Sequence, residues 1–446
     1  VKTAKGVIWY PVSESLWAVV APGRSTAQKS LLLGPQDIRL LNRFKETTGL
    51  SPDALSAGER EKAFRWLDPA FHLLEKNDDQ RPMAPHEDLA FAAFREYQSA
   101  RELEGQHDLA RYHLSEISDP FHQFEAVEMT VSHLYREPHP VLDGKSYGAR
   151  MAQGLLESGE IRSGSRILEV GCGTGIFGRE FLRELKQASS SLYKSISYTF
   201  FDISPALSQS QQEINREHLP LVSFRTGNAF TASFEEAAYD LIISNEMIAD
   251  LPVVKLKKGE PPHGNAEAEA WRMAGEFGLD FSDAPPEFTV NIGALRFLSS
   301  LNRALKKGGK AYVIEYGSPH GYPVAYHVTD HTEYSIHMGH MMSAADRLGM
   351  GPDLRPLPEF LRFQEHVDVL EDIIHAALFQ HLLPLIGVEA ESSRVYTQDM
   401  LTEALPDIIP KTANLQFVPI ESQGGIVYPK AFYALTLSKG GPTYCR

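Results

Sequence analysis

The chain of 446 residues contains only two cysteines, Cys172 and Cys445, which excludes a disulfide framework or a thiolate zinc site as its organising principle. No segment approaches the roughly 20 consecutive apolar residues that a membrane-spanning helix needs. Basic side chains are few, since 43 Lys and Arg stand against 58 Asp and Glu and give a net charge of −15. A general nucleic-acid binder needs a basic surface to displace counterions. We therefore expect neither nucleic acid nor a membrane as a partner.

The first 20 residues lack the apolar core of a secretory signal and the Arg/Ser bias of a transit peptide. Together with the scarcity of cysteine, this predicts a soluble, cytoplasmic protein in a reducing compartment. At roughly 100–200 residues per domain, the length predicts two or three domains.

Changes of pattern along the chain predict five regions. The central one alternates short apolar runs with helical segments, as parallel strands covered by helices on both faces do, and predicts an α/β Rossmann-like core. A polar stretch at 252–288 is typical of an insertion after a strand. The predicted regions are a small N-terminal α+β, winged-helix-like module (1–76), a linker and helical lead-in (77–159), the Rossmann-like core (160–317), a helical, His-rich cap (318–410) and the final strands of the core sheet (411–446).

The strongest motif is RILEVGCGTGIFGREFLREL at residues 166–185, in which a buried strand leads into Gly171, Gly173 and Gly175 and then into a helix. Glycines let the backbone turn sharply and approach a ligand, and a helix N-terminus offers unpaired N–H groups. Because a strand precedes this glycine triplet and a helix follows it, the triplet indicates a nucleotide-binding loop. Asp202 ends the next strand, where it is placed to accept hydrogen bonds from a ribose diol.

Two classes of nucleotide site compete for this motif. A dinucleotide site has the pattern G-x-G-x-x-G, whereas this chain has G-x-G-x-G preceded by Glu169. The second pattern is characteristic of class I S-adenosylmethionine methyltransferases, in which the acid helps to organise the methionine end of the cofactor. The alternatives are a dinucleotide-binding fold and a degenerate relative that no longer binds the cofactor. Further predicted cofactor contacts lie on the helix before the core, after the third strand and after the fourth: Tyr147, Arg150, Asn228, Ala229 and Asn245.

Three linked segments resemble the MidA-like family of methyltransferases. They are YTFFDISPALSQSQQ (198–212), SNEMIADLPV (244–253) and VIEYG (313–317), and the resemblance covers roughly residues 140–350. It implies a Rossmann-like fold and use of S-adenosylmethionine. The family includes mitochondrial complex I assembly factors that methylate a protein arginine, so the resemblance also implies an arginine-like acceptor. This chain departs from the family pattern at Asp250, which stands one position later than usual, and at Glu315, which replaces Asp.

Methyl transfer from a sulfonium is an in-line displacement, which requires a nucleophile about 3 Å from the methyl group and a place for its proton. Glu246 and Asp250 follow the fourth strand of the predicted sheet, at the edge where open α/β proteins bind ligands. A carboxylate there can hold a guanidinium in a bidentate manner. We therefore predict these two as catalytic residues, and the alternative is that they cap or order a loop.

His337 and His340 have the spacing H-x-x-H, which places two side chains on one face of a helix. With Glu246, Asp250 or another His they could hold iron, manganese or zinc. A Lewis-acid metal would assist methylation of a carbon next to a carbonyl, because it stabilises the enolate. The alternative is a pair of hydrogen-bonded loop histidines.

Three functional hypotheses follow. The first is a methyltransferase acting on a protein or peptide side chain, and the second is a metal-assisted C- or O-methyltransferase acting on a natural product or a carrier-bound acyl substrate. The third is a non-catalytic assembly factor that retains the fold. The complete set of Glu169, glycines and Asp202 argues against the third, because a scaffold has no need of it.

Overall fold

The computed structural model describes residues 130–327, 332–371, 395–404 and 415–440, together with short strands near the N-terminus and the single residues Leu40 and Ser56. The chain divides into two compact units. One comprises residues 1–104 and 367–419, and the other comprises residues 105–366 and 420–446.

The first unit contains three small antiparallel sheets in its described part. Their strands are β1 (Lys2–Thr3) with β5 (Leu74–Glu75), β2 (Ile8–Ser13) with β3 (Leu16–Ala21) and β4 (Lys29–Leu33), and β17 (Asp368–Leu370) with β18 (Phe417–Pro419). Helix α16 (Gln398–Ala404) belongs to the same unit. The helical part of the predicted N-terminal module and the predicted linker up to residue 129 lie outside the described residues, so the winged-helix-like character stays a prediction.

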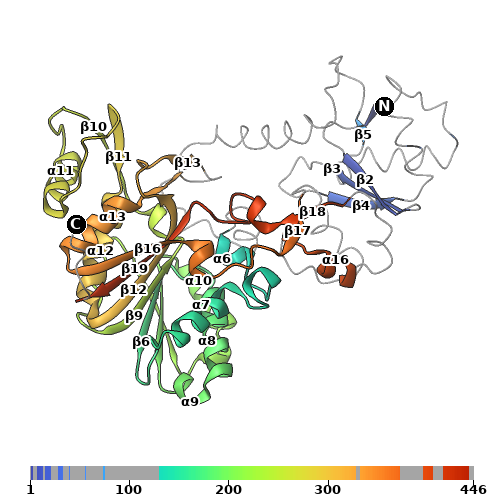
Figure 1. Ribbon diagram of the computed structural model, residues 1–446, viewed down its shortest axis with the longest axis horizontal. Coiled ribbons are helices and arrows are strands. Elements are labelled where there is room, and N and C mark those ends of the chain that lie inside the picture. Colours follow the sequence, from blue (N-terminus) through green and yellow to red (C-terminus); the bar gives the residue numbers. More distant parts are fainter. Residues whose placement is uncertain are drawn as a thin grey trace. The chain divides into compact units, whose positions relative to one another are not determined.

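The second unit is built on a mixed sheet with the strand order β8-β7-β6-β9-β12-β19-β16 (Figure 1). The strands are β6 (Arg166–Val170), β7 (Ser197–Asp202), β8 (Val222–Thr226), β9 (Tyr239–Asn245), β12 (Leu305–Ser318), β16 (Met350–Pro356) and β19 (Phe432–Lys439). β19 runs antiparallel between β12 and β16, and the other six point the same way. The short strand β15 (Ile336–His337) pairs with the end of β12.

Helices cover both faces of this sheet (Figure 1). The central strands are therefore largely buried, as in β6, where all residues after the first are buried. One face carries α7 (Tyr147–Glu157), α8 (Ile176–Ala188) and α10 (Pro205–Ile214), and the other carries α12 (Ile292–Ala304) and α13 (Met338–Arg347). None of the described helices is long and apolar enough to cross a bilayer.

Smaller elements surround the ends of the strands. The polar insertion predicted at 252–288 forms a separate antiparallel pair with a helix between its strands, β10 (Val254–Lys257), α11 (Asn265–Phe277) and β11 (Glu287–Val290). Others are α6 (Val131–Leu134), α9 (Ser190–Tyr193), η5 (Ile248–Asp250), β13 (Ala325–His327), β14 (Thr332–Tyr334) and α14 (Leu357–Phe360).

The structure differs from the predicted cap and final strands in two respects. Within 318–410, which we expected to be a helical cap, β16 is a strand of the core sheet. Its Pro352 and Pro356 concealed it in the sequence, because proline lacks an N–H and is confined to edge strands such as this one. The second difference is β18, expected in the core sheet, which pairs with β17 in the first unit.

Two glycines of α7 offer a matched test of the packing between α7 and α8. A Cβ added to Gly148 would lie 2.4 Å from the carbonyl oxygen of Phe177 in α8, whereas a Cβ added to Gly154 would meet nothing within 4 Å. We expect Gly148→Ala to lower the free energy of unfolding by about 1–3 kcal/mol, since the two helices must move apart. Gly154→Ala should leave it unchanged or raise it by up to about 1 kcal/mol. Urea unfolding followed by circular dichroism measures both, and equal effects would contradict this close contact.

Candidate functional site

The C-terminal ends of β6 and β9 mark the point where the strand order reverses. From β6 the chain proceeds outward to β7 and β8, and it then returns to β9 on the other side of β6. Open α/β sheets bind ligands at such a point. The glycine segment follows β6 and the Asn245–Glu246 segment follows β9, so the structure brings the two strongest sequence motifs to one edge.

The glycine segment turns in the left-handed region, with φ of +74°, +52° and +83° at Gly171, Gly173 and Gly175. Side chains disfavour this region. A Cβ on Gly171 would lie 2.4 Å from Cγ of Met247, so the missing side chain lets the chain leaving β6 pass the chain leaving β9. Gly175 is the N-cap of α8 and provides no side-chain cap. The first N–H groups of α8 can therefore receive an anionic group.

Asp202 at the end of β7 is joined to the glycine segment. Its Oδ2 accepts a hydrogen bond from the N–H of Gly173 (2.8 Å), and its Oδ1 accepts one from the N–H of Ser204 (2.9 Å). Burial raises the pKa of Asp202 to about 6, although these N–H groups oppose the rise. A carboxylate has about four acceptor positions, so Asp202 can accept further hydrogen bonds from a ligand.

Glu169 lies in β6, and its side chain is only 2% exposed. One of its oxygens accepts a hydrogen bond from the hydroxyl of Tyr198 (2.8 Å). Burial raises the pKa of Glu169 to about 8, the Tyr198 bond opposes this rise, and the charge of Asp202 adds to it. The side chain is therefore mainly protonated at neutral pH, and a cation placed beside it would favour ionisation.

A chain of hydrogen bonds fixes the residues that follow β9. The hydroxyl of Tyr147 donates to Oδ1 of Asn245 (2.6 Å), and Nδ2 of Asn245 donates to Oε1 of Glu246 (2.9 Å). Glu246 also accepts from the backbone N–H groups of Val131 (2.7 Å) and Ser132 (3.1 Å). Its own backbone has φ of +51°. The Glu246 carboxylate thus caps α6 and fastens the segment before α7 to the sheet edge, as its alternative role predicted.

Glu315, near the end of β12, is a site residue that the sequence prediction did not include. It is 2% exposed, and its oxygens accept from the backbone N–H groups of Ala249 (3.1 Å) and Tyr316 (3.0 Å). Its pKa lies well above the usual range because of burial, followed by the negative charges of Glu246 and Glu333. The signal was present in VIEYG, where an acid ends an apolar strand at the same edge as Glu246.

Tyr316 stands beside these carboxylates. Its hydroxyl is buried and has no hydrogen-bond partner among the residues that the structure describes. Burial, followed by the charges of Glu333 and Glu315, raises the pKa of this hydroxyl, and Asp250 in η5 contributes to the same rise. Glu246, Asp250 and Glu315 therefore form one acidic group with Tyr316 at the ends of β9 and β12, which we call the acidic site.

Three other predicted cofactor contacts are placed as follows. Arg150 is buried, and its Nε donates to the carbonyl oxygen of Leu361 (2.9 Å). That donor is therefore used to hold α7 against the segment after α14. Asn228 and Ala229 follow β8 at the ligand-binding edge of the sheet, where Oδ1 of Asn228 accepts from the N–H of Phe230 (2.8 Å) and Ala229 is buried.

His337 and His340 pack on each other. Their rings are stacked with centroids 3.5 Å apart, and Nδ1 of His337 accepts from the N–H of His340 (3.2 Å), which caps α13. Burial lowers the pKa of both, that of His337 to about 4, and Tyr322 lies edge-on to both rings. In the described part of the chain, no three His, Cys, Asp or Glu side chains form a group that could hold a metal. The expected convergence of these histidines with Glu246 or Asp250 is not found there.

Comparison with known proteins places this geometry in context. Residues 145–349 match a family model described as a methyltransferase domain. None of the curated proteins matches the sequence. One similar solved structure is a Burkholderia thailandensis protein bound to S-adenosylhomocysteine, with 16% identity, a TM-score of 0.43, and coverage of 81% of this chain and 96% of that one. Another is phosphoethanolamine N-methyltransferase 2 of Haemonchus contortus in complex with S-adenosylmethionine, with 12% identity, a TM-score of 0.39, and coverage of 76% and 61%.

The raised pKa of Glu169 predicts a pH dependence of stability. Between pH of about 4.5 and 8 the folded protein keeps this proton, whereas the unfolded chain releases it. Wild-type stability should therefore fall as pH rises through this window, by up to about 1.36 kcal/mol per pH unit from this group. Glu169→Gln, which cannot ionise, should remove that part of the slope in urea unfolding at pH 5 to 7.5.

Glu235→Gln is the matched control. Glu235 is exposed, and its ion pair with Arg166 lowers its pKa, so its ionisation contributes nothing to the slope above pH 5. Equal slopes for the wild type and Glu169→Gln would show that Glu169 ionises normally in the folded protein.

Proposed function

The chain is an S-adenosylmethionine-dependent methyltransferase, and we propose that its acceptor is a cationic, arginine-like side chain of a protein or peptide. The acidic site is the observation that carries this proposal. Glu246 and Glu315 lie close enough for the charge of Glu246 to raise the pKa of Glu315. Buried carboxylates this close together repel each other when ionised, so the site favours a positively charged ligand.

We assign S-adenosylmethionine to the switch point between β6 and β9. The first N–H groups of α8 would receive its carboxylate, Asp202 its ribose hydroxyls, and Asn228 and Ala229 its adenine. Glu169 would ionise in the field of the cofactor's positive charge. Tyr147 and Asn245, which join this region to Glu246, would adjoin the methionine end. The cofactor supplies an electrophilic methyl group on a positively charged sulfur.

The acidic site has the groups that a guanidinium needs. A guanidinium presents five N–H donors in a planar fork that matches carboxylate geometry. Glu246 accepts from the N–H groups of Val131 and Ser132, from Nδ2 of Asn245 and from the side chain of Ser132, so its acceptor positions are taken. Burial raises the pKa of Glu246 and these bonds oppose the rise, so a cation beside it would favour its ionised form. Glu315 accepts from two backbone N–H groups among the described residues and retains about two acceptor positions. The buried hydroxyl of Tyr316 offers a further acceptor. A carboxylate that becomes ionised when the cation binds can later take the proton that the methylated nitrogen loses.

The metal-assisted alternative requires His337 and His340 to meet the acidic site. Their contacts with each other, with Tyr322 and with the carbonyl oxygen of Asp280 favour a role in packing and capping. The cationic acceptor is therefore the hypothesis that these contacts support better.

The cofactor assignment predicts that Asp202→Ala weakens binding of S-adenosylmethionine by about 10- to 100-fold, because charge-assisted hydrogen bonds to the ribose are each worth about 1.5–3 kcal/mol. Isothermal titration calorimetry measures the dissociation constant. Asp353→Ala, which removes a carboxylate from the edge strand β16, should bind like the wild type. Undiminished binding by Asp202→Ala would place the cofactor elsewhere.

The acceptor assignment predicts that Glu246→Gln lowers kcat on an arginine-containing peptide by at least about 10-fold while changing cofactor affinity by less than about twofold, because it alters the acidic site and leaves the glycine segment intact. Transfer of a radiolabelled methyl group from S-adenosylmethionine to a panel of arginine peptides measures kcat. Glu213→Gln, on the exposed surface of α10, serves as the control. Full turnover in Glu246→Gln would remove Glu246 from the mechanism, and a wild type inactive on every such peptide would overturn the arginine acceptor.

A further inference from the structure

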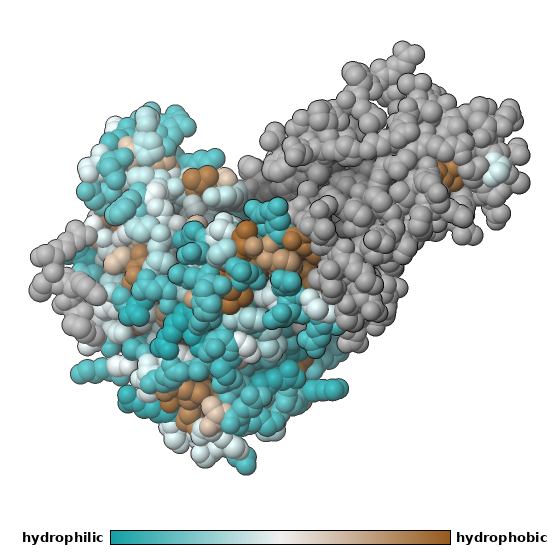
Figure 2. Space-filling model, turned by 45° about the vertical axis from the view of Figure 1, so that its right-hand side comes forward, coloured by the Kyte–Doolittle hydropathy of each residue, from teal (hydrophilic) through white to brown (hydrophobic). Residues whose placement is uncertain are grey.

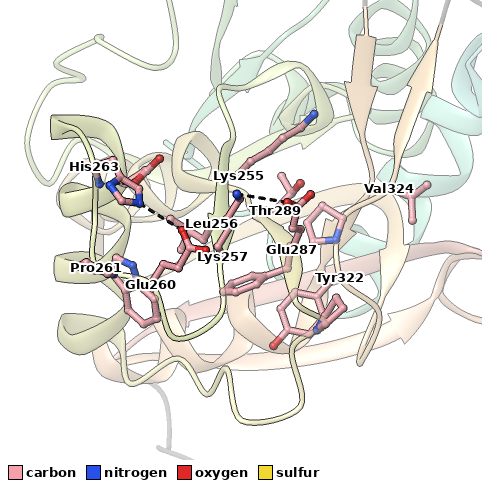
Figure 3. Close-up of a pocket in the computed structure, with 15 residues that line it drawn as sticks. Lys255, Leu256, Lys257, Glu260, Pro261, His263, Glu287, Thr289, Tyr322 and Val324 are labelled. Atoms are coloured by element: carbon pink, nitrogen blue, oxygen red, sulfur yellow. Dashed lines mark hydrogen bonds and ion pairs between the residues drawn. The ribbon is translucent and has the colours of Figure 1, made fainter.

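A pocket of about 590 Å³ opens in the insertion that follows β9 (Figure 3). Its wall is aromatic and is formed by Trp271 of α11, Phe288 of β11 and Tyr322. These rings are held in place, since Phe281 lies against Trp271 (5.4 Å between centroids) and Phe288 (4.9 Å), and Tyr322 lies edge-on to Phe288 (5.3 Å). A preformed concave surface of this size and chemistry is suited to bulky apolar groups.

Charged groups of both signs line the rim of this pocket. Lys257 lies 3.7 Å from Glu287 across the β10–β11 pair, and His263 lies 3.3 Å from Glu260, as the dashed lines of Figure 3 mark. Two lysines and three glutamates line the pocket, so the rim has a small net charge and provides little net attraction for an ion. The aromatic wall therefore dominates what the pocket can recognise.

Two exposed apolar residues extend the pocket along the neighbouring strand. The visible surface of the described residues is mostly hydrophilic, with apolar residues in a few small patches (Figure 2). Val324, which lines the pocket, is 57% exposed, and Tyr326 is 51% exposed. The N–H of Val324 donates to the hydroxyl oxygen of Ser335 (2.9 Å), and the C=O of Val324 accepts from the N–H of Ser335 (3.0 Å), next to the β13–β14 pair. Val324 and Tyr326 are two residues apart on this strand, so their side chains share one face.

This face leads to the acidic site. The ring of Tyr326 lies edge-on to that of Tyr316, with centroids 5.1 Å apart, and Tyr316 is the aromatic member of the acidic site. The pocket, Val324, Tyr326 and Tyr316 therefore form a continuous apolar path, which we call the Val324 path. Tyr322 and Tyr326 are four residues apart, which corresponds to about 13 Å of extended chain, and the step from Tyr326 to Tyr316 adds 5.1 Å between ring centroids. An extended peptide needs about four to six residues for this path.

We propose that the Val324 path is the docking surface for an extended segment of the acceptor polypeptide. A bulky apolar or aromatic residue of that segment occupies the pocket, about four to six residues away from the cationic residue that lies in the acidic site. The assignment of the cationic residue to the acidic site rests on the proposed function, whereas the assignment of the apolar residue rests on the pocket. The chemistry of the two ends is complementary to a peptide rather than to a small acceptor, because a small acceptor would leave Val324 and Tyr326 in water.

The test is a selection of random 12-residue peptides on the full-length protein saturated with S-adenosylhomocysteine, followed by fluorescence anisotropy of the selected peptides. We expect enrichment of sequences with an aromatic or bulky apolar residue about four to six positions from an Arg or Lys. Val324→Asp should weaken the binding of these peptides at least 10-fold, and Tyr326→Ser should weaken it to a similar degree.

Leu219→Asp is the matched control. Leu219 is 49% exposed and precedes β8, at the edge of the sheet opposite to the acidic site. Both Asp variants change an exposed apolar residue, so both should keep the wild-type melting temperature, and Leu219→Asp should keep full peptide affinity.

Two outcomes would overturn the docking surface: selected peptides that bind Val324→Asp as tightly as the wild type, or a selection that enriches nothing over the Val324→Asp protein. A third outcome separates this inference from the proposed function. If the enriched peptides carry the apolar residue without a cation and depend on Val324, the docking surface stands and the cationic acceptor is wrong.

Discussion

The site depends on how two segments of chain leave neighbouring parallel strands at the same edge of the sheet. β6 and β9 are paired, so the residues that follow them must turn within a few ångströms of each other. The turn after β6 has room because Gly171 has no side chain where Met247 passes, and both Gly171 and Glu246 adopt positive φ. With these turns fixed, the glycine segment meets Asp202 and the Glu246 carboxylate meets α6. A larger residue at Gly171 would disturb both halves at once.

Buried acids give this edge its character. Glu169, Asp202 and Glu315 each lie near or at the end of a core strand, and burial raises the pKa of each one. Transfer of a carboxylate out of water is costly unless hydrogen bonds or a cation replace the lost hydration. Backbone N–H groups replace part of that hydration at Asp202 and Glu315. The remainder can come from a positively charged ligand, and the sulfonium of the cofactor and a guanidinium both carry that charge.

Local patterns predicted the parts of this arrangement that are local in the sequence. Strand, glycines and helix follow one another without interruption at 166–185, so periodicity and composition suffice there. The partners of Glu246 could not be predicted, because Val131 and Ser132 lie 115 and 114 residues earlier and contribute only backbone N–H groups, which every sequence has. The H-x-x-H spacing of His337 and His340 suits a metal site and equally suits a capped helix with stacked rings. The three-dimensional contacts of the two rings are needed to distinguish these two roles. The strand β16 could not be predicted from its sequence, because its prolines are compatible with a strand only at the edge of a sheet, where the outer side is unpaired.

The bonds of Glu246 and the position of β19 also bear on where the chain can be cut. The recognisable methyltransferase pattern spans residues 145–349. A fragment with those ends would lack Val131 and Ser132, and the Glu246 carboxylate would lose two of its backbone donors. It would also lack β16 and β19, so β12 would present an unpaired edge of the kind that recruits other chains into aggregates. The stretch that can be recognised from sequence is thus shorter than the stretch that an expression fragment must retain, at both ends, to keep these contacts.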